Sequence, residues 1–344
     1  MPIGLSRVPE FGLSLATEGG DAPPVRNPWN PDLTAGGSSG GAAAAVAAGI
    51  VALAHATDAA GSIRVPAACC GLVGLKPSRG AFPGEADGGN HLMGLASELV
   101  LARSVRDVRH AFDLTGLILG TPLRPKPIPG LPVTVGLAIP DRCAPAQADA
   151  ARRAALALWR SGCEGREVSA PDALGARAAA LARTILSASL AEWLGSLRIQ
   201  DDKVSPLAVA VAAEGRALPG TAVFAASREV ARISQESWRL FDGVSVLLMP
   251  VLSGTPPRAG SFDPEPTTPQ RRFAAMEAFA PNAALANVAG FPALALPFGM
   301  SDGLPVGIQL WARPGEDAAL LDLGERLERL ASPLAFPHAI AGLP

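Results

Sequence analysis

Short apolar runs and longer helical patterns alternate along most of the chain. The runs "LPVTVGLAI" and "VSVLLMPVL" are rich in β-branched residues and typical of buried strands, and "FPALALPFG" and "PVGIQLWA" repeat the pattern near the end. Helical periodicity is present in "SVRDVRHAFDLTGLI", in the alanine-rich run from Asp149 to Leu197 and in "DAALLDLGERLERLA". Strands that alternate with helices predict an α/β fold whose sheet is covered on both faces.

The first part of the chain is patterned differently. Prolines in "DAPPVRNPWNPD" predict loops over residues 1–39. A helix is predicted from about Gly41 to Ala48, with Ser39 as its N-cap and Gly49 at its end. After it, "GIVALAH" indicates a buried strand, "TDAAGSIRVPAACCG" a turn, and "GLVGLKPS" another short apolar segment.

The composition and net charge of the chain limit the kinds of molecule that it is expected to bind. A chain of 344 residues with 49% hydrophobic and 17% charged side chains can bury a large core. Its net charge of -2 provides neither a basic stripe nor a polybasic anchor, so we expect no nucleic acid and no membrane as partner. Residues 40–56 are apolar, but they are mostly Gly and Ala, which favours a buried helix over a membrane span.

The cysteines and histidines indicate no metal site. None of the four histidines has a partner at metal-ligand spacing, and His55 is expected to be a satisfied core histidine in a strand. The four cysteines also lack such spacing, and reduced thiols are the simplest interpretation. The N-terminus has neither the basic nor the apolar region of a secretory signal. We therefore expect a cytoplasmic protein with no metal and no other cofactor.

The candidate chemistry lies in two serine-bearing segments. "TAGGSSGGAAAAVAAG" sets Ser38 and Ser39 between glycines, although flexible linkers share this composition. In "DAAGSIR", 24 residues further on, Ser62 follows small residues whose backbone N–H groups can converge on one point, as an oxyanion hole requires. The alternative is a plain turn capped by the hydroxyl of Ser62. The second motif alone favours neither interpretation.

In combination, the two motifs resemble the amidase signature family of serine amide hydrolases. The resemblance extends from "GGSSGG" and "TDAAGSIRVPAACCGLVGLKPSRG" to "PEFGLS" and "NPWNP" before them, and to "VSVLLMPVLSGTPP" and "NVAGFPALALPFGMSDGLPVGIQLWA" in the second half. The sequence of these motifs is most similar to the broad amidase and cyclic-amide hydrolase branch of the family. The resemblance implies one amidase signature domain over residues 1–344, with a signature core at 34–80, folded as α/β/α layers around a mixed sheet.

The same resemblance implies roles for individual residues. It makes Ser62 the nucleophile and Ser38 the bridging serine in a cis peptide, while Ser39 organises the start of the helix. Asp58 and Arg64 would brace the turn as an ion pair. The oxyanion hole would consist of the backbone N–H groups of Ala59, Ala60, Gly61 and Ser62. Many relatives have glycine where this chain has Ala60, which matters little because the donor is the backbone.

The family's catalytic base is a buried lysine kept neutral by desolvation. The resemblance places this lysine far upstream of the first serine, beyond the 37 residues that precede Ser38. Lys76 matches a structural position of the family, Lys126 lies in a proline-rich loop, and Lys203 follows an exposed "DD". We therefore expect the N-terminal portion of the family's domain to be missing. Its loss should expose apolar surface, which favours homo-oligomers. Without the lysine, we expect the activity to be at most slight.

The expected function is hydrolysis of a small-molecule amide to a carboxylate and ammonia or an amine. One alternative is a truncated pseudo-amidase that lacks the base lysine. Another is the A subunit of a tRNA-dependent amidotransferase. No motif identifies the substrate; "FPGEADGGNHLMG" and the alanine-rich helices of 175 to 215 are the segments expected to line its pocket.

Overall fold

The computed structural model describes residues 3–19, 22–82, 91–119, 133–262 and 268–337. The strands form two sheets, one small and one large. The strands are β1 (Arg26–Asn27), β2 (Asn30–Thr34), β3 (Leu53–Asp58), β4 (Val73–Lys76), β5 (Ser97–Ala102), β6 (Thr134–Ile139), β7 (Glu164–Ser169), β8 (Val246–Pro250), β9 (Ala293–Ser301) and β10 (Leu304–Trp311).

Helices separate most of these strands in the chain. The α-helices are α1 (Gly40–Ala47), α2 (Arg64–Cys70), α3 (Val105–Leu119), α4 (Pro145–Arg160), α5 (Asp172–Ser196), α6 (Pro206–Arg216), α7 (Gly220–Ser237), α8 (Pro269–Phe279), α9 (Ala283–Ala289) and α10 (Asp317–Leu330). The short 3₁₀ helices are η1 (Glu10–Gly12), η2 (His91–Gly94), η3 (Asp201–Lys203) and η4 (Trp238–Phe241).

The large sheet is mixed, as expected. Its eight strands lie in the order β3-β5-β4-β9-β10-β8-β6-β7. Pairing is antiparallel from β3 as far as β8, whereas β8, β6 and β7 run parallel to one another. Because β4 lies between β5 and β9, the strand after the second serine motif is built into the middle of the sheet beside a strand from the end of the chain.

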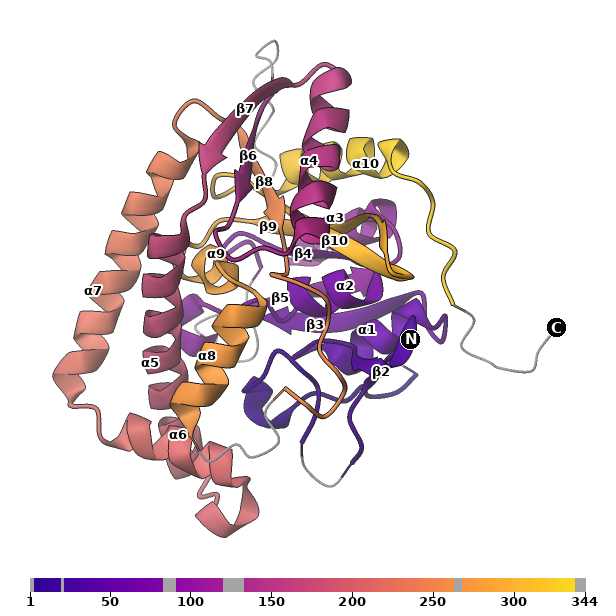
Figure 1. The fold of residues 1–344 in the computed structure, drawn as a ribbon. Coiled ribbons are helices and arrows are strands. Elements are labelled where there is room, and N and C mark those ends of the chain that lie inside the picture. The colour runs from indigo at the N-terminus through magenta and orange to yellow at the C-terminus, as the bar shows by residue number, and fades with distance from the viewer. Residues whose placement is uncertain (1–2, 20–21, 83–90, 120–132, 263–267, 338–344) are drawn as a thin grey trace.

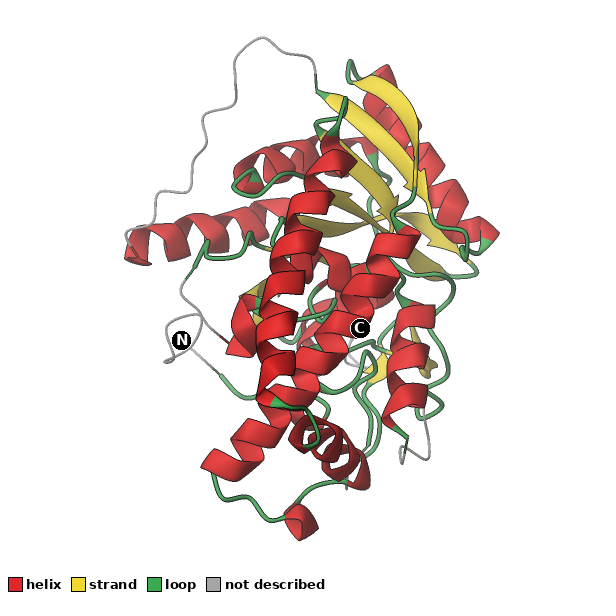
Figure 2. Cartoon of the chain, turned by 90° about the vertical axis from the view of Figure 1, so that its left-hand side faces the viewer, coloured by secondary structure: helices red, strands yellow, loops and turns green. Residues whose placement is uncertain are grey.

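Helices cover both faces of this sheet, which confirms the α/β/α layers (Figure 1). One face packs against α1, α2, α3, α4 and α10. Residues of α5, α7 and α9 form a second apolar cluster with side chains of the other face, including Met249 and Trp311. In Figure 2 the long helices of this second layer lie in front of the strands. The two layers bury the central strands on both sides, which explains their nearly continuous apolar sequences.

Several expected elements are confirmed, with small shifts at their ends. The helix predicted from Gly41 to Ala48 is α1, and Gly49 follows its C-cap with φ of 80°, a conformation that glycine adopts without steric cost. The predicted strand "GIVALAH" begins only at Leu53 and is partly exposed, because β3 is an edge strand of the sheet. His55 is therefore exposed and paired with Glu98, so the expectation of a core histidine was wrong.

Two segments differ in type from the prediction. The alanine-rich run from Asp149 to Leu197 is not one helical region, because the polar edge strand β7 lies between α4 and α5. The segment predicted as a turn contains the buried helix α2 despite Pro66. Proline is tolerated there because it lies in the first helical turn, where backbone N–H groups have no partner within the helix.

No single helix among the described residues combines the length and apolar character needed to cross a membrane. One pair of helices in the part of the chain that the structure describes, residues 206–216 and 220–241, has the length and composition of a span when taken together, and it is bent by 94°.

Candidate active site

The two serine-bearing segments meet beside the start of α1. The backbone N–H of Ser39 donates a hydrogen bond to the carbonyl oxygen of Ser62 at 3.3 Å. The peptide bond between Gly37 and Ser38 is cis, as the resemblance implied. Ser38, Ser39 and Ser62 are each at most 6% exposed, so the structure brings all three predicted serines together in a nearly buried site.

Thr17 holds the glycine-rich segment in place. Its hydroxyl donates to the carbonyl oxygens of Gly36 and Ser38, at 3.0 and 3.1 Å, and accepts from the N–H of Gly40 at 3.1 Å. A side chain on Gly40 would collide with this threonine. Sequence reasoning missed Thr17; the only available signal was its place shortly after "PEFGLS", a segment that already belonged to the resemblance.

Ser39 does not cap α1 through its side chain, contrary to the prediction. Its hydroxyl instead accepts a hydrogen bond from the N–H of Thr57 at 3.3 Å and donates to the carbonyl oxygen of the same residue at 3.4 Å. Thr57 lies on β3, so these bonds tie the start of the helix to the strand that leads into the second serine motif. The N-cap prediction used only the local sequence, in which the Ser39 hydroxyl could bond the first N–H groups of the helix. It could not take into account β3, because only folding brings that strand next to Ser39.

The turn between β3 and α2 is organised around the carboxylate of Asp58. This side chain accepts hydrogen bonds from the backbone N–H groups of Gly61 and Ile63, at 2.7 and 3.2 Å. It also receives two hydrogen bonds from the guanidinium of Arg64, each of 3.0 Å, and both side chains are at most 1% exposed. The predicted ion pair is therefore present, and its two parallel hydrogen bonds fix the turn more strongly than a single contact would.

Two amides from the end of the chain complete this network. Asn287, on α9, donates to the backbone oxygen of Asp58 at 2.6 Å and accepts from Arg64 at 2.8 Å. Gln309, on β10, accepts from Arg64 at 3.3 Å and from the indole N–H of Trp311 at 2.7 Å. Sequence reasoning missed both amides, although "NVAGFPALALPFGMSDGLPVGIQLWA" was part of the resemblance.

Burial and the charges of this network shift the pKa values of neighbouring groups. Burial alone raises the pKa of Asp58, but the charge and hydrogen bonds of Arg64 outweigh it, and the carboxyl pKa lies below its ordinary value. Lys76, fully buried on β4, has its pKa lowered to about 7, first by desolvation and then by the positive charge of Arg64. The ammonium of Lys76 donates to the carbonyl oxygen of Pro77 at 2.5 Å.

The turn presents backbone donors next to a cavity. Gly61 already donates its N–H to Asp58, so this member of the predicted oxyanion hole is occupied. Among the described residues, none accepts a hydrogen bond from the N–H groups of Ala59, Ala60 or Ser62. Of these three, Ala60 also lines the cavity. The oxyanion hole itself stays a prediction, with Ala59, Ala60 and Ser62 as the members whose N–H groups have no acceptor among the described residues.

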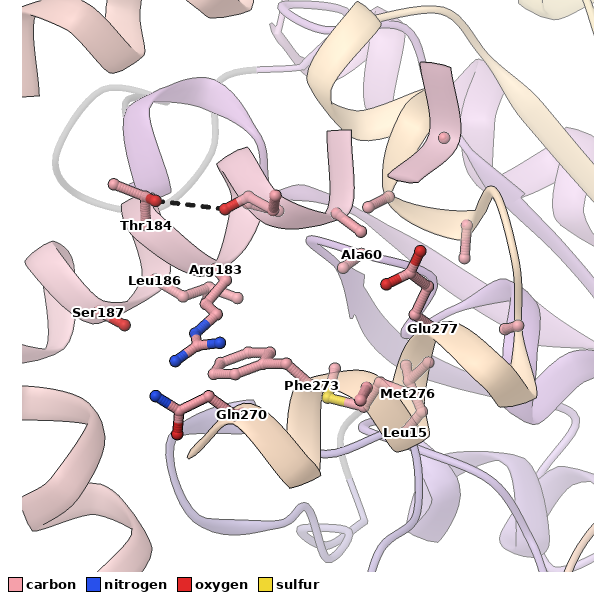
Figure 3. Close-up of a pocket in the computed structure, with 18 of the residues that line it drawn as sticks. Leu15, Ala60, Arg183, Thr184, Leu186, Ser187, Gln270, Phe273, Met276 and Glu277 are labelled. Atoms are coloured by element: carbon pink, nitrogen blue, oxygen red, sulfur yellow. Dashed lines mark hydrogen bonds between the residues drawn. The ribbon is translucent and has the colours of Figure 1, made fainter. Parts of the chain in front are cut away.

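The cavity has a volume of about 560 Å³ and lies between α5, α8 and α9 (Figure 3). Leu15 and Ala60 form its wall on the side of the serine site, and Phe273 and Met276 contribute apolar surface from α8. Of the helices of 175 to 215 that were predicted to line a pocket, α5 lines this cavity with several of its residues between Gly175 and Ser187, and α6 lines it with Glu214. Within "FPGEADGGNHLMG", residues 83–90 lie outside the described part of the chain, and the other residues do not line this cavity.

Neither of the two lysines in the described part of the chain hydrogen-bonds to Ser38, Ser39 or Ser62. Lys203 is exposed and paired with Asp202, and Lys126 lies outside the described residues. Lys76 is buried, and its side chain donates a hydrogen bond to the carbonyl oxygen of the next residue, Pro77. No group of three or more His, Cys, Asp or Glu side chains within the described ranges could hold a metal ion.

Comparison with known proteins identifies the family. The amidase family model matches residues 1–119 and 132–321. A putative amidase AmiC of Mycobacterium tuberculosis is 35% identical over 98% of this chain and 73% of its own length. The chain belongs to the amidase signature family. A 6-aminohexanoate-cyclic-dimer hydrolase of Paenarthrobacter ureafaciens is 33% identical over 95% of the chain and 72% of its own length.

Solved structures of the family show the same fold. The structure of 6-aminohexanoate cyclic dimer hydrolase complexed with substrate matches 96% of this chain and 75% of its own, with a TM-score of 0.87 and 32% identity. In sequence, the chain is also similar to the A subunit of the glutamyl-tRNA(Gln) amidotransferase from Thermus thermophilus, at 34% identity over 98% of this chain and 75% of that subunit's length. By family, the chain is an amide hydrolase.

Proposed function

We propose that this chain hydrolyses a carboxylic amide to a carboxylate and ammonia or an amine through an acyl-enzyme on Ser62. The observation that carries the proposal is the hydrogen bond from the N–H of Ser39 to the carbonyl oxygen of Ser62, because it joins the two serine motifs, and Ala60 of the second motif lines the cavity. We further propose that residues 1–344 form one amidase signature domain. The continuity of the large sheet, which takes strands from both halves of the chain, supports this.

The proposed reaction has two steps. The hydroxyl oxygen of Ser62 attacks the amide carbonyl carbon, and the N–H groups of Ala59, Ala60 and Ser62 stabilise the negative charge on the carbonyl oxygen. Ser38 accepts the proton of Ser62 as it gives up its own hydroxyl proton to a base, and that base returns the proton to the departing nitrogen, so that an ester to Ser62 remains and an amine leaves. Water then hydrolyses the ester and restores the serine.

The rate depends on what removes the proton from Ser38. No described lysine has a hydrogen bond to any of the three serines, and Lys76 donates to Pro77. Removing one member of a catalytic triad in other hydrolases leaves about 10³–10⁴-fold acceleration over water, which comes from oxyanion stabilisation and binding. We therefore expect slow turnover, faster on activated aryl esters than on amides because good leaving groups need less proton donation.

The test compares an aryl ester with its matching anilide, using wild type, Ser62→Ala and Ser38→Ala. Wild type should release the ester's phenol above the background rate, and Ser62→Ala should not. Ser38→Ala should lower the ester rate by a smaller factor than Ser62→Ala, because the residual rate comes mostly from oxyanion stabilisation and binding, and its unfolding midpoint should stay close to that of wild type. Equal rates for wild type and Ser62→Ala would contradict the proposal and favour a pseudo-amidase.

A second candidate function rests on the similarity to the A subunit of an amidotransferase. Such a chain would use the same serines within an assembly. Copurification of an affinity-tagged chain from its own cells, followed by mass spectrometry, tests this: a stoichiometric partner would support the amidotransferase, and a chain without one would favour the independent amidase.

A further inference from the structure

The charged groups that line the cavity among the described residues fall into two sets. In the first, Arg183 on α5 donates two hydrogen bonds to the carboxylate of Glu214 on α6, at 2.6 and 3.3 Å. Gln270 donates to the same carboxylate at 3.1 Å, and the guanidinium of Arg183 lies 5.5 Å from the centre of the Phe273 ring. The charges of Arg183 and Glu214 therefore compensate each other, and neither is available to a ligand without breaking this cluster.

Glu277 on α8 forms the second set by itself. It lines the same cavity and is exposed. No residue in the described part of the chain hydrogen-bonds to its carboxylate or forms an ion pair with it. In Figure 3 this carboxylate is turned toward the side of the cavity where Ala60 lies, whereas the guanidinium of Arg183 is turned toward Gln270. Among the described residues that line the cavity, Glu277 is thus the one charge without a partner, and it is negative.

The remaining wall is apolar over the part nearest the serines. Leu15, Ala60, Met276, Ala280 and Ala283 supply it, with no charged side chain among them. An alkyl chain would be stabilised here, because this wall removes its apolar surface from water. A ligand with an apolar stem and a positively charged end would match both features of the cavity.

We propose that the cavity binds amides that carry an ammonium group on an aliphatic chain, and that Glu277 receives this ammonium. The inference rests on the proposed function, since it places the amide at the N–H group of Ala60 and the stem along the apolar wall. Glu277 is then a specificity-determining residue that acts on binding and takes no part in the bond rearrangement. Because its carboxylate is exposed, solvent screens the contact, and the preference for a cation is modest and falls with added salt.

The experiment measures binding without turnover. Alkanesulfonamides from propanesulfonamide to octanesulfonamide cannot be cleaved by the proposed reaction, and each has a counterpart with a terminal amine. Isothermal titration with the full chain at neutral pH and low salt should show that the amine binds about two- to fivefold more tightly than its neutral partner at the best length. Glu277→Gln should bring the ratio close to one. Glu192→Gln is the matched control, because Glu192 is also exposed on a helix but does not line the cavity.

The outcomes separate this inference from the proposed function. Equal affinities for the amine and its neutral partner, no binding of either, or an unchanged ratio in Glu277→Gln would each overturn the inference, whatever the ester assay shows. A preference for the amine that Glu277→Gln removes would support it. If that preference is present while Ser62→Ala hydrolyses the ester as fast as wild type, the subsite is correct and the acyl-enzyme proposal is the part that fails.

Discussion

The signature core and the wall of the cavity are built on different principles. In the signature core, Asp58, Arg64 and Ser39 are nearly or fully buried, and each makes specific hydrogen bonds to another segment, as does Thr17 from outside the core. The part of the cavity wall nearest the serines consists of alanines and other apolar side chains, and a further residue of the wall, Glu277, carries the uncompensated charge. The first region fixes the positions of backbone donors and hydroxyls, and the second provides space.

This difference indicates how each region tolerates change. A buried charge that loses its partner remains in a medium of low dielectric constant, so a substitution in the signature core has a large free-energy cost. A side chain at the cavity wall faces open volume, so a substitution there changes what fits while the fold is barely affected. The predictions below test that contrast, from the largest expected effect on stability to the smallest.

The largest effect is expected for Asp58→Ala. The substitution leaves the guanidinium of Arg64 buried without its carboxylate and releases the N–H of Gly61. Removing one partner of a buried ion pair typically costs about 3–5 kcal/mol in the free energy of unfolding. Urea denaturation measures it. Asp149→Asn removes an exposed ion pair with Arg152 and should cost less than about 1 kcal/mol; similar losses for the two variants would refute the contrast.

Lys76→Met should change how stability depends on pH. In the folded chain Lys76 has a pKa of about 7, below the ordinary value of 10.5, so between pH 7 and about pH 8.5 the unfolded chain binds more protons and wild type gains stability as pH rises. The gain over this window is about 1–2 kcal/mol. The window ends there because burial raises the pKa values of Cys69 and Cys70, an effect of the opposite sign at higher pH. A gain of the same size in Lys76→Met would show that another group is responsible.

Ser39→Ala should have a smaller effect. It removes the two hydrogen bonds between the hydroxyl and Thr57, at 3.3 and 3.4 Å, and leaves the polar backbone of the strand without that partner. The expected cost is about 1 kcal/mol of unfolding free energy. Ser234→Ala provides a matched control, since it removes a single hydroxyl bond to a backbone carbonyl on the opposite layer. A Ser39→Ala variant as stable as wild type would mean that these long bonds contribute nothing.

The smallest effect on stability is expected at the cavity wall. Ala179→Leu on α5 adds volume to a half-buried position that faces the cavity, and it should change the free energy of unfolding by no more than about 0.5 kcal/mol. The same substitution should weaken binding of the longer alkanesulfonamides, because it occupies their space. If Ala179→Leu lost several kcal/mol of unfolding free energy and bound the alkanesulfonamides as wild type does, position 179 would belong to the packed core and not to the cavity wall.

The sequence was sufficient for the local part of the site and insufficient for the rest. Asp58 and Arg64 are six residues apart in one motif, so their pairing could be predicted. Asn287 reaches Asp58 from 229 residues away, and only the fold brings them together. The layered α/β/α fold followed from alternating patterns, whereas β7 was missed because an edge strand can be polar and its neighbours are rich in alanine.

The most direct test of the account is intact-mass measurement after treatment with a fluorophosphonate probe, which forms a stable adduct with a nucleophilic serine. Wild type should acquire one adduct, and peptide mapping should locate it on Ser62. Ser62→Ala should remain unlabelled under the same conditions, while Ser253→Ala, which removes a hydroxyl that already donates to the carbonyl oxygen of Ala278, should be labelled like wild type. Labelling that persists in Ser62→Ala, or no labelling of wild type at all, would contradict the claim that Ser62 is the nucleophile.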